Sequence, residues 1–160
     1  MFAQKSRAKS LPTSALALAL LAFVAIPSAS FAAEIEVHMK NHGGGGTYNV
    51  FDPAFVHVAP GDTVHFIPSS PGHNVVSIDG MLPTGADPLK SAPGQDYRVT
   101  LTKEGVYGYR CTPHFGLGMV GVIVVGRAAN VKQAEVVIVS SPRAQANITA
   151  LLKQAELYAQ

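Results

Sequence analysis

The only cysteine in this chain of 160 residues opens a short loop that also carries a histidine and a methionine. In "YRCTPHFGLGM" the spacing is C-x2-H-x4-M, formed by Cys111, His114 and Met119. The pattern "VYGYR" ends where this loop begins, and the apolar run "MVGVIVV" starts where it finishes, so the loop joins two expected strands. The proline and the two glycines within the loop favour a tight turn. A loop this short between adjacent strands can point all three side chains at one centre.

The first 32 residues have the pattern of a secretory signal peptide. Lys5, Arg7 and Lys9 precede an apolar run at 15–26, and small residues follow at the positions that a signal peptidase reads. The run is short for a membrane span, so we favour a leader cleaved after residue 32 or 33 over a membrane anchor. No later run is long enough to span a membrane, so we expect the mature chain to be free of the membrane.

Removal of this leader leaves about 127 residues, which is enough for one domain with its own core. The leader holds three basic residues and no acidic ones, so the formal net charge of +2 falls to about −1. This balance argues against nucleic acid as a partner.

Most of the mature chain alternates apolar and polar residues over short runs, which predicts strands. These runs lie at 34–39, 55–58, 63–67, 97–102, 106–110 and 119–125. About seven short strands separated by glycine and proline predict an all-β sandwich or barrel over residues 33–126.

The composition shifts after Gly126, and we expect residues 127–160 to form a helical extension of the same domain. Residues 130–138 suit one or two helical turns, and Pro142 suits the first turn of a longer helix. Four apolar residues of that helix share one face: Ile148, Leu151, Leu152 and Ala155. We expect it to pack on the sandwich rather than to bind a partner or a membrane, because its polar face is not basic.

The types of side chain in the cysteine loop indicate copper. A thiolate, an imidazole and a thioether are soft or borderline ligands, and His73 in "PGHNVV" is the best candidate for a fourth. Two imidazoles, one thiolate and a weak methionine sulfur form a blue-copper electron-transfer site. The protein would fill all four positions, which predicts a carrier and not an enzyme. We expect the other mature histidines to be solvated surface residues: His38, His42, His57 and His65.

Several motifs along the mature chain resemble one family of copper proteins. They are "EIEVHM" at 34–39, "PGDTVHFIP" at 60–68, "GHNV" at 72–75 and "CTPHFGLGM" at 111–119. With the helical tail that follows, the chain resembles the cupredoxins and, within them, the pseudoazurins. Plastocyanins share the loop spacing but end soon after the next strand, and amicyanins have a shorter loop.

The resemblance implies a Greek-key cupredoxin sandwich that holds one type 1 copper. On the matching positions, the ligands would be His73, Cys111, His114 and Met119. Asn74 would brace the site through hydrogen bonds to the cysteine loop.

The resemblance also implies a monomeric, periplasmic carrier that cycles between Cu(I) and Cu(II). Its transient partners would be a copper nitrite reductase of denitrification, a cytochrome or a cytochrome peroxidase. The electron would leave through His114, inside an apolar patch that residues 115–118 would form together with Met81 and Pro83. Members of the family surround this patch with lysines, whereas here only Lys90 and Arg110 are expected at its rim.

Two other functions are compatible with copper ligands. A copper-delivery or storage protein would favour exposed clusters of methionine or histidine, and the three mature methionines are well separated. A fragment of a copper oxidase or reductase would need a second, open, histidine-rich site, and the spare histidines form no H-x-H pair. We therefore expect an electron carrier and keep copper delivery as the alternative.

Overall fold

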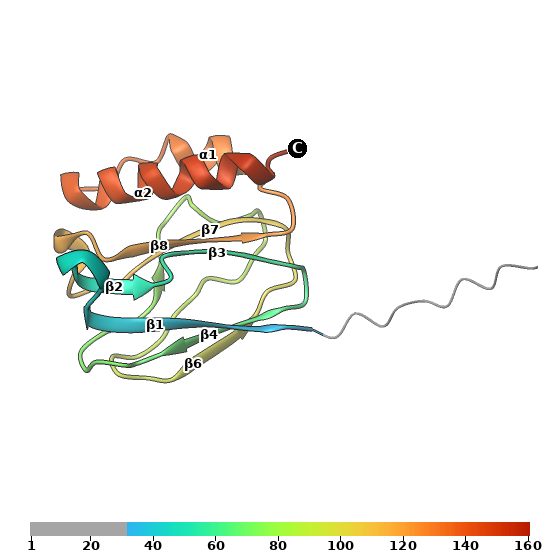
Figure 1. Ribbon diagram of the computed structural model, residues 1–160. Coiled ribbons are helices and arrows are strands. Elements are labelled where there is room, and N and C mark those ends of the chain that lie inside the picture. Colours follow the sequence, from blue (N-terminus) through green and yellow to red (C-terminus); the bar gives the residue numbers. More distant parts are fainter. Residues whose placement is uncertain (1–31) are drawn as a thin grey trace, which may run out of the picture. The chain divides into compact units, whose positions relative to one another are not determined.

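The computed structural model describes residues 32–160, so the expected signal peptide lies outside this range apart from its last residue. Residues 32–160 form eight strands in two four-stranded sheets, followed by two α-helices (Figure 1). The strands are β1 Glu34–His42, β2 Tyr48–Asp52, β3 Phe55–Val58, β4 Thr63–Ile67, β5 Val76–Ser77, β6 Tyr97–Thr100, β7 Gly105–Arg110 and β8 Val120–Val125. The helices are α1 Val131–Glu135 and α2 Pro142–Ala155, and short 3-10 turns lie at η1 Gly44–Gly46, η2 Phe115–Leu117 and η3 Glu156–Tyr158. No helix within 32–160 is long and apolar enough to cross a bilayer.

The two sheets pack face to face as an open sandwich. One sheet has the order β2-β1-β4-β6 and the other has the order β3-β8-β7-β5. The β1–β4 and β3–β8 pairs are parallel, and the remaining pairs are antiparallel. The prediction of an all-β fold with C-terminal helices is confirmed. Of the two all-β forms predicted, residues 32–160 adopt the sandwich and not a closed barrel.

The alternation of apolar residues correctly located the core-facing side of most strands. Val37 and Met39 on β1, and Val64 and Phe66 on β4, are fully buried and belong to one core cluster between the sheets. Neither β2 nor β5 was predicted from the sequence pattern. Strand β5 has only two residues, which is too short for any periodicity to show.

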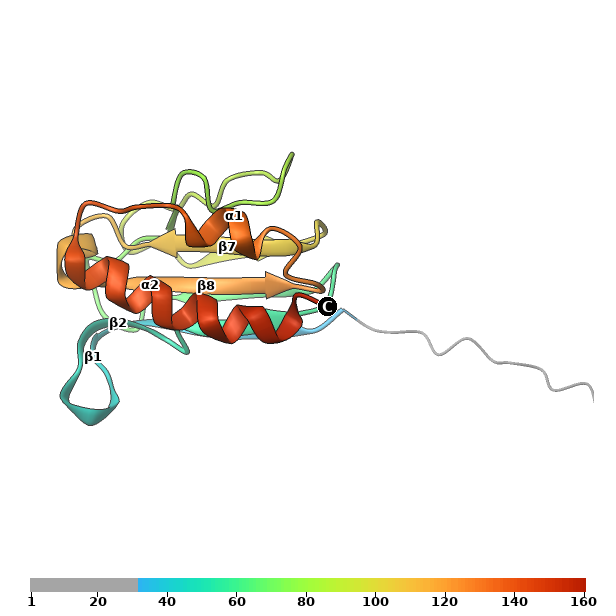
Figure 2. The same cartoon turned by 90° about the horizontal axis from the view of Figure 1, so that it is seen from above.

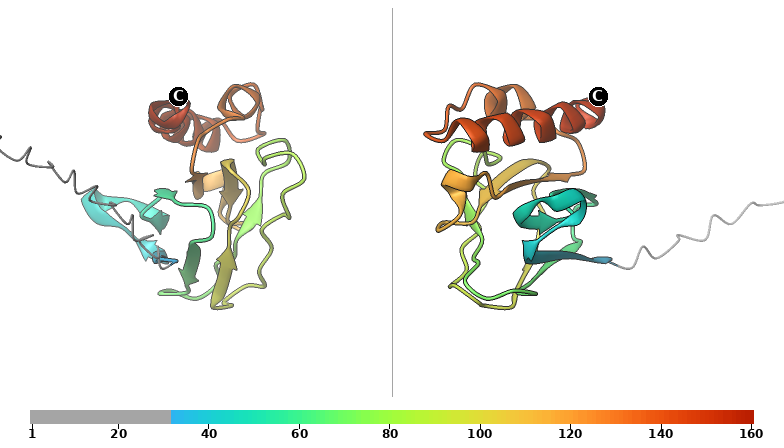
Figure 3. Two further views of the ribbon diagram at one scale, coloured as in Figure 1. Left: turned by 90° about the vertical axis from the view of Figure 1, so that its right-hand side faces the viewer. Right: turned by 60° about the vertical axis from the view of Figure 1, so that its left-hand side comes forward.

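Strand β8 is buried on both faces, which explains its continuous apolar sequence. Ile123 and Val125 face the core between the sheets, whereas Val120, Val122 and Val124 belong to a second cluster that includes residues of both helices. Seen from above, α2 lies along β8 and α1 lies beside it, near β7 (Figure 2). The helical tail therefore forms a third layer over the sheet that carries β7 and β8, as the side views also show (Figure 3).

Helix α2 begins as the sequence predicted. The Ser141 side chain accepts a hydrogen bond from the Ala144 N–H, and Pro142 occupies the first turn, where its missing N–H is not needed. The buried face consists of Ala144, Ile148, Leu152 and Ala155. The expected packing of this helix on the sandwich is confirmed.

Candidate metal centre

The cysteine loop is shaped by backbone hydrogen bonds at its two ends. Strands β7 and β8 pair up to Arg110↔Val120, and the Cys111 N–H then donates to the Met119 carbonyl at 3.0 Å. The Met119 N–H donates to the His114 carbonyl at 3.2 Å. Both Cys111 and Met119 are buried, at 0% and 1% exposure, and lie in the same core cluster. The loop thus brings its three predicted ligands into one region.

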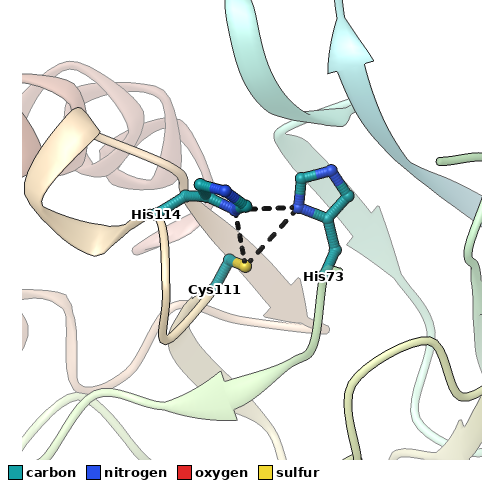
Figure 4. A group of neighbouring side chains, drawn as sticks. All are labelled: His73, Cys111 and His114. Atoms are coloured by element: carbon teal, nitrogen blue, oxygen red, sulfur yellow. Dashed lines mark hydrogen bonds between the residues drawn. The ribbon is translucent and has the colours of Figure 1, made fainter. Parts of the chain in front are cut away.

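His73 approaches the cysteine loop from the segment just before β5. Its Nδ1 lies 3.6 Å from Cys111 Sγ and 3.1 Å from His114 Nδ1, and Cys111 Sγ lies 3.5 Å from His114 Nδ1. Figure 4 shows the three side chains pointing toward one another. The sequence predicted that these three residues meet, and the structure brings them together.

The three donor atoms have the spacing that one metal ion requires. Donors bound to a common ion through bonds of about 2.0–2.3 Å lie about 3–4 Å apart, and all three separations fall within that range. Two nitrogens and one sulfur, with a methionine opposite the cysteine at the end of the loop, match the preferences of copper. The residues present therefore fit the ion.

A residue that the sequence analysis missed, Asn41, selects the tautomer of His73. The Asn41 Oδ1 lies 2.8 Å from His73 Nε2 and can only accept, so that nitrogen carries the proton. In the neutral ring the Nδ1 then offers its lone pair toward Cys111 and His114, which is the form that a metal binds. Asn41 lies near the end of β1, and no local signal in the sequence marks this role.

The protonation states of the site follow from its burial. Desolvation, with a smaller contribution from the neighbouring His114, lowers the pKa of His73 and favours the neutral ring. Burial raises the pKa of the Cys111 thiol, against the opposing effect of backbone hydrogen bonds from Asn74 and His114. At neutral pH, these two shifts favour a neutral His73 ring and a protonated Cys111 thiol in the metal-free site.

Asn74 links the His73 segment to the cysteine loop. Its Oδ1 accepts from the Thr112 N–H at 2.8 Å, and its Nδ2 donates to Thr112 Oγ1 at 3.2 Å. Asn74 is 7% exposed. These two bonds hold together segments that are 38 residues apart, which matches the bracing contacts expected for this residue.

The remaining histidines lie outside the cluster, and one of them corrects a prediction. His65 was expected to be solvated, but it is 5% exposed and its Nε2 lies 2.9 Å from both Asp96 carboxylate oxygens. It sits on the central strand β4, where Glu36 of β1 and Arg98 of β6 flank it. Neighbours on both sides therefore cover a side chain that alternation alone assigned to solvent.

The surface around His114 is partly as expected. His114 and Phe115 are half-buried, Leu117 is 51% exposed, and the Arg110 guanidinium lies 4.7 Å from the centre of the Phe115 ring. Met81 and Pro83 are buried, so their expected place in the patch is wrong. Both residues lie between β5 and β6 and pack inside the domain. No periodic pattern covers this segment, so the sequence could not show that the two side chains are buried.

Comparison with known proteins identifies the family. Residues 37–126 match the model of copper binding proteins of the plastocyanin/azurin family. The pseudoazurin of Paracoccus pantotrophus is 48% identical over 113 residues, which cover 71% of this chain and 77% of that protein. The chain belongs to the pseudoazurins.

Solved structures agree with this assignment. The pseudoazurin of Methylobacterium extorquens AM1 is similar with a TM-score of 0.71 and 44% identity, over 76% of this chain and 98% of that one. The pseudoazurin of Hyphomicrobium denitrificans is similar with a TM-score of 0.72 and 33% identity, over 76% and 97%. The chain is thus a cupredoxin-fold electron carrier whose cofactor is copper, and His73, Cys111, His114 and Met119 form the arrangement of a type 1 copper site.

Proposed function

We propose that His73, Cys111, His114 and Met119 are the four copper ligands and that Asn74 and Asn41 orient them. The observation that carries this proposal is the triangle of donor atoms, in which every side is between 3.1 and 3.6 Å. When bound, copper supplies the one-electron Cu(I)/Cu(II) couple. The chain contributes a buried thiol, two imidazoles and a thioether, with no position reserved for a substrate, so we propose a carrier and not an enzyme.

The electron would leave through His114. This residue is half-buried at the end of the molecule where the exposed Leu117 and the ring of Phe115 form a small apolar surface. A small apolar contact gives weak binding, which suits a transient encounter because a carrier must release its partner quickly. Arg110 lies at the edge of this surface and Lys90 is exposed, so electrostatic steering toward an acidic partner would be modest.

We propose that the protein acts in the periplasm as a monomer and donates electrons to a copper nitrite reductase or another redox protein there, such as a cytochrome or a cytochrome peroxidase. The support is the leader-like sequence at 1–32 and membership of the pseudoazurins. Cleavage after residue 32 or 33 would leave one domain, with a β-sandwich over 33–126 and its helical extension over 127–160.

The ligand assignment is tested by the visible spectrum of the mature protein loaded with Cu(II), before and after ascorbate. We expect an intense thiolate-to-copper band that bleaches on reduction and returns on oxidation. Cys111→Ser should lose the band while circular dichroism shows an intact fold, and Met119→Leu should shift the band while retaining copper. A weakly coloured wild-type protein would overturn the assignment and favour copper delivery.

The proposed partner is tested by mixing the reduced protein with a purified copper nitrite reductase and nitrite. We expect the blue colour to return at a rate that depends on reductase concentration. Leu117→Ala should slow this reaction without changing the spectrum, because Leu117 is exposed beside His114. Reoxidation at the same rate without reductase would contradict this partner.

A further inference from the structure

The C-terminal helix contacts the ligand loop through hydrogen bonds as well as through apolar packing. Asn147 Nδ2 donates to the Gly118 carbonyl at 2.8 Å, and the Ser141 hydroxyl donates to the Gly116 carbonyl at 3.1 Å. Figures 1 and 2 both place the first turns of α2 beside the 3-10 turn that ends the loop. Two carbonyl groups of the loop are therefore held by side chains that lie 25 and 29 residues further along the chain.

The approach of helix and loop depends on the conformation of Gly118. This glycine has φ +88°, and a Cβ there would lie 2.7 Å from Asn147 Nδ2 and 3.0 Å from Arg143 Cγ. A side chain would thus be strained by the backbone and would collide with the helix. The absence of a side chain lets the Asn147 amide reach the carbonyl directly.

The Gly118 carbonyl belongs to the peptide bond that leads into Met119. Because a peptide unit is planar and rigid, fixing its oxygen also fixes its N–H and the Met119 Cα. That N–H donates to the His114 carbonyl, and the Met119 carbonyl accepts from Cys111. One hydrogen bond from the helix therefore acts on a short backbone network that includes three of the proposed ligands.

We propose that Asn147 and Ser141 are positioning residues, through which the C-terminal helix sets the place of Met119 and so tunes the metal centre. The tuning rests on the proposed function, because it requires Met119 to be a ligand. The axial ligand adjusts the potential of a blue-copper site, and contacts beyond the ligands commonly orient them. Asn147 is exposed, and its amide reaches the carbonyl of the buried Gly118. The helix can therefore act on the position of the loop without contributing a ligand of its own.

The variant Asn147→Asp separates hydrogen bonding from packing. Aspartate has the shape of asparagine but, when ionised, has no donor and places an oxygen against the Gly118 carbonyl. A packing role predicts that Asn147→Asp resembles wild type and Asn147→Ala does not. A hydrogen-bonding role predicts that both variants change, with Asp changed at least as much as Ala. Ala146→Asp, next to Asn147 on the same helix and also exposed, controls for the added charge, because Ala146 does not line the cavity that Met119, Asn147 and Ala150 share.

The first readout needs no metal. Amide hydrogen exchange of the metal-free protein should accelerate about fivefold at Met119 and Cys111 in both Asn147 variants, the factor that one hydrogen bond of ordinary net strength represents. Exchange at Val122 and Val124 in β8 should stay at the wild-type rate. Unchanged exchange at Met119 would overturn the positioning role, whether or not the protein binds copper.

The second readout is the reduction potential and visible spectrum of the copper-loaded proteins. We expect both Asn147 variants to shift the potential and the band intensities relative to wild type, and Ala146→Asp to leave the band intensities unchanged. Faster loop exchange with an unchanged spectrum and potential would overturn the tuning of the centre. A wild-type protein without the blue band would instead refute the proposed function, and the exchange result would still decide whether the helix holds the loop.

Ser141 needs a variant that keeps the helix cap. Ser141→Asp retains an oxygen that accepts from the Ala144 N–H but removes the donor to Gly116. We expect it to accelerate exchange at Leu117 and Gly118 while the amides of α2 keep their protection. Equal loss of protection along α2 would show that Ser141 serves the helix and not the loop.

Discussion

Asn74 offers the sharpest test of how the site is held before any metal binds. Replacing it with alanine removes the bond from the Thr112 N–H at 2.8 Å and the bond to Thr112 Oγ1 at 3.2 Å. Each bond has a net value of about 0.5–1.5 kcal/mol, and leaving the N–H without its partner adds about 1 kcal/mol or more. We therefore expect Asn74→Ala to lower the free energy of unfolding by about 2–4 kcal/mol.

Thr112→Ala is the matched control, because it removes the longer bond and leaves the bond to the backbone N–H in place. We expect it to cost about 0.5–1 kcal/mol. For a domain of this size, the melting temperature should fall by about 3–5 °C per kcal/mol, so the two variants should differ by several degrees.

The assay is denaturant unfolding of the metal-free, reduced protein, followed by fluorescence and circular dichroism. The slope of free energy against denaturant should be the same in all three proteins, since none changes the area that unfolding exposes. Equal losses in Asn74→Ala and Thr112→Ala would refute the reasoning, because the bond to the backbone N–H would then contribute nothing.

Three further predictions concern single groups. Tyr109→Phe should leave the free energy of unfolding unchanged or raise it, because the buried Tyr109 hydroxyl has no hydrogen-bond partner within residues 32–160. Tyr107→Phe should lower it by about 1 kcal/mol, because the Tyr107 hydroxyl donates to the Lys103 carbonyl at 2.8 Å, and thermal unfolding compares the two variants. Loading the metal-free protein with Zn²⁺ at neutral pH should release about one proton, because burial raises the pKa of the Cys111 thiol and the metal binds the thiolate. A pH indicator measures the release, and no release would contradict a protonated thiol. The hydrogen bond from His65 holds the pKa of Asp96 below its usual range. The stabilising effect of this bond is present above the ordinary carboxyl pKa and is lost as the pH falls through the lowered value, so Asp96→Asn should flatten the acid side of the profile of unfolding free energy against pH.

The sequence was sufficient to predict the three donors that meet at the centre. Cys111 and His114 share one loop between adjacent strands, so local spacing already determined that they are close. The choice of His73 over the other histidines came from a neighbouring turn and from the family resemblance. The same local information predicted most strands, because β8 and the inward faces of β1 and β4 are clearly apolar.

The residues that orient the centre could not be predicted in the same way. Asn41 contacts His73 across 32 residues, and Asn147 contacts Gly118 across 29. A side-chain amide finds its partner through the three-dimensional approach of two segments, and no periodicity records that approach. His65 was misjudged for a related reason, because alternation describes one strand and the covering groups of His65 lie on the strands beside it.

The parallel pairing of β3 with β8 has a consequence for how fast the site can form. It joins Phe55 to Val122 and Val58 to Val125, so the chain must close a loop of more than sixty residues before β8 is fixed between its neighbours. Contacts of such long sequence separation slow folding, into the range of about milliseconds to seconds for sandwich folds. Until that closure, the hairpin of β7 and β8 that carries Cys111 lacks its neighbour β3. The early, local steps of refolding should therefore be complete before the site is assembled. A soft metal ion present during refolding should bind partly folded chains and delay the pairing of β3 with β8.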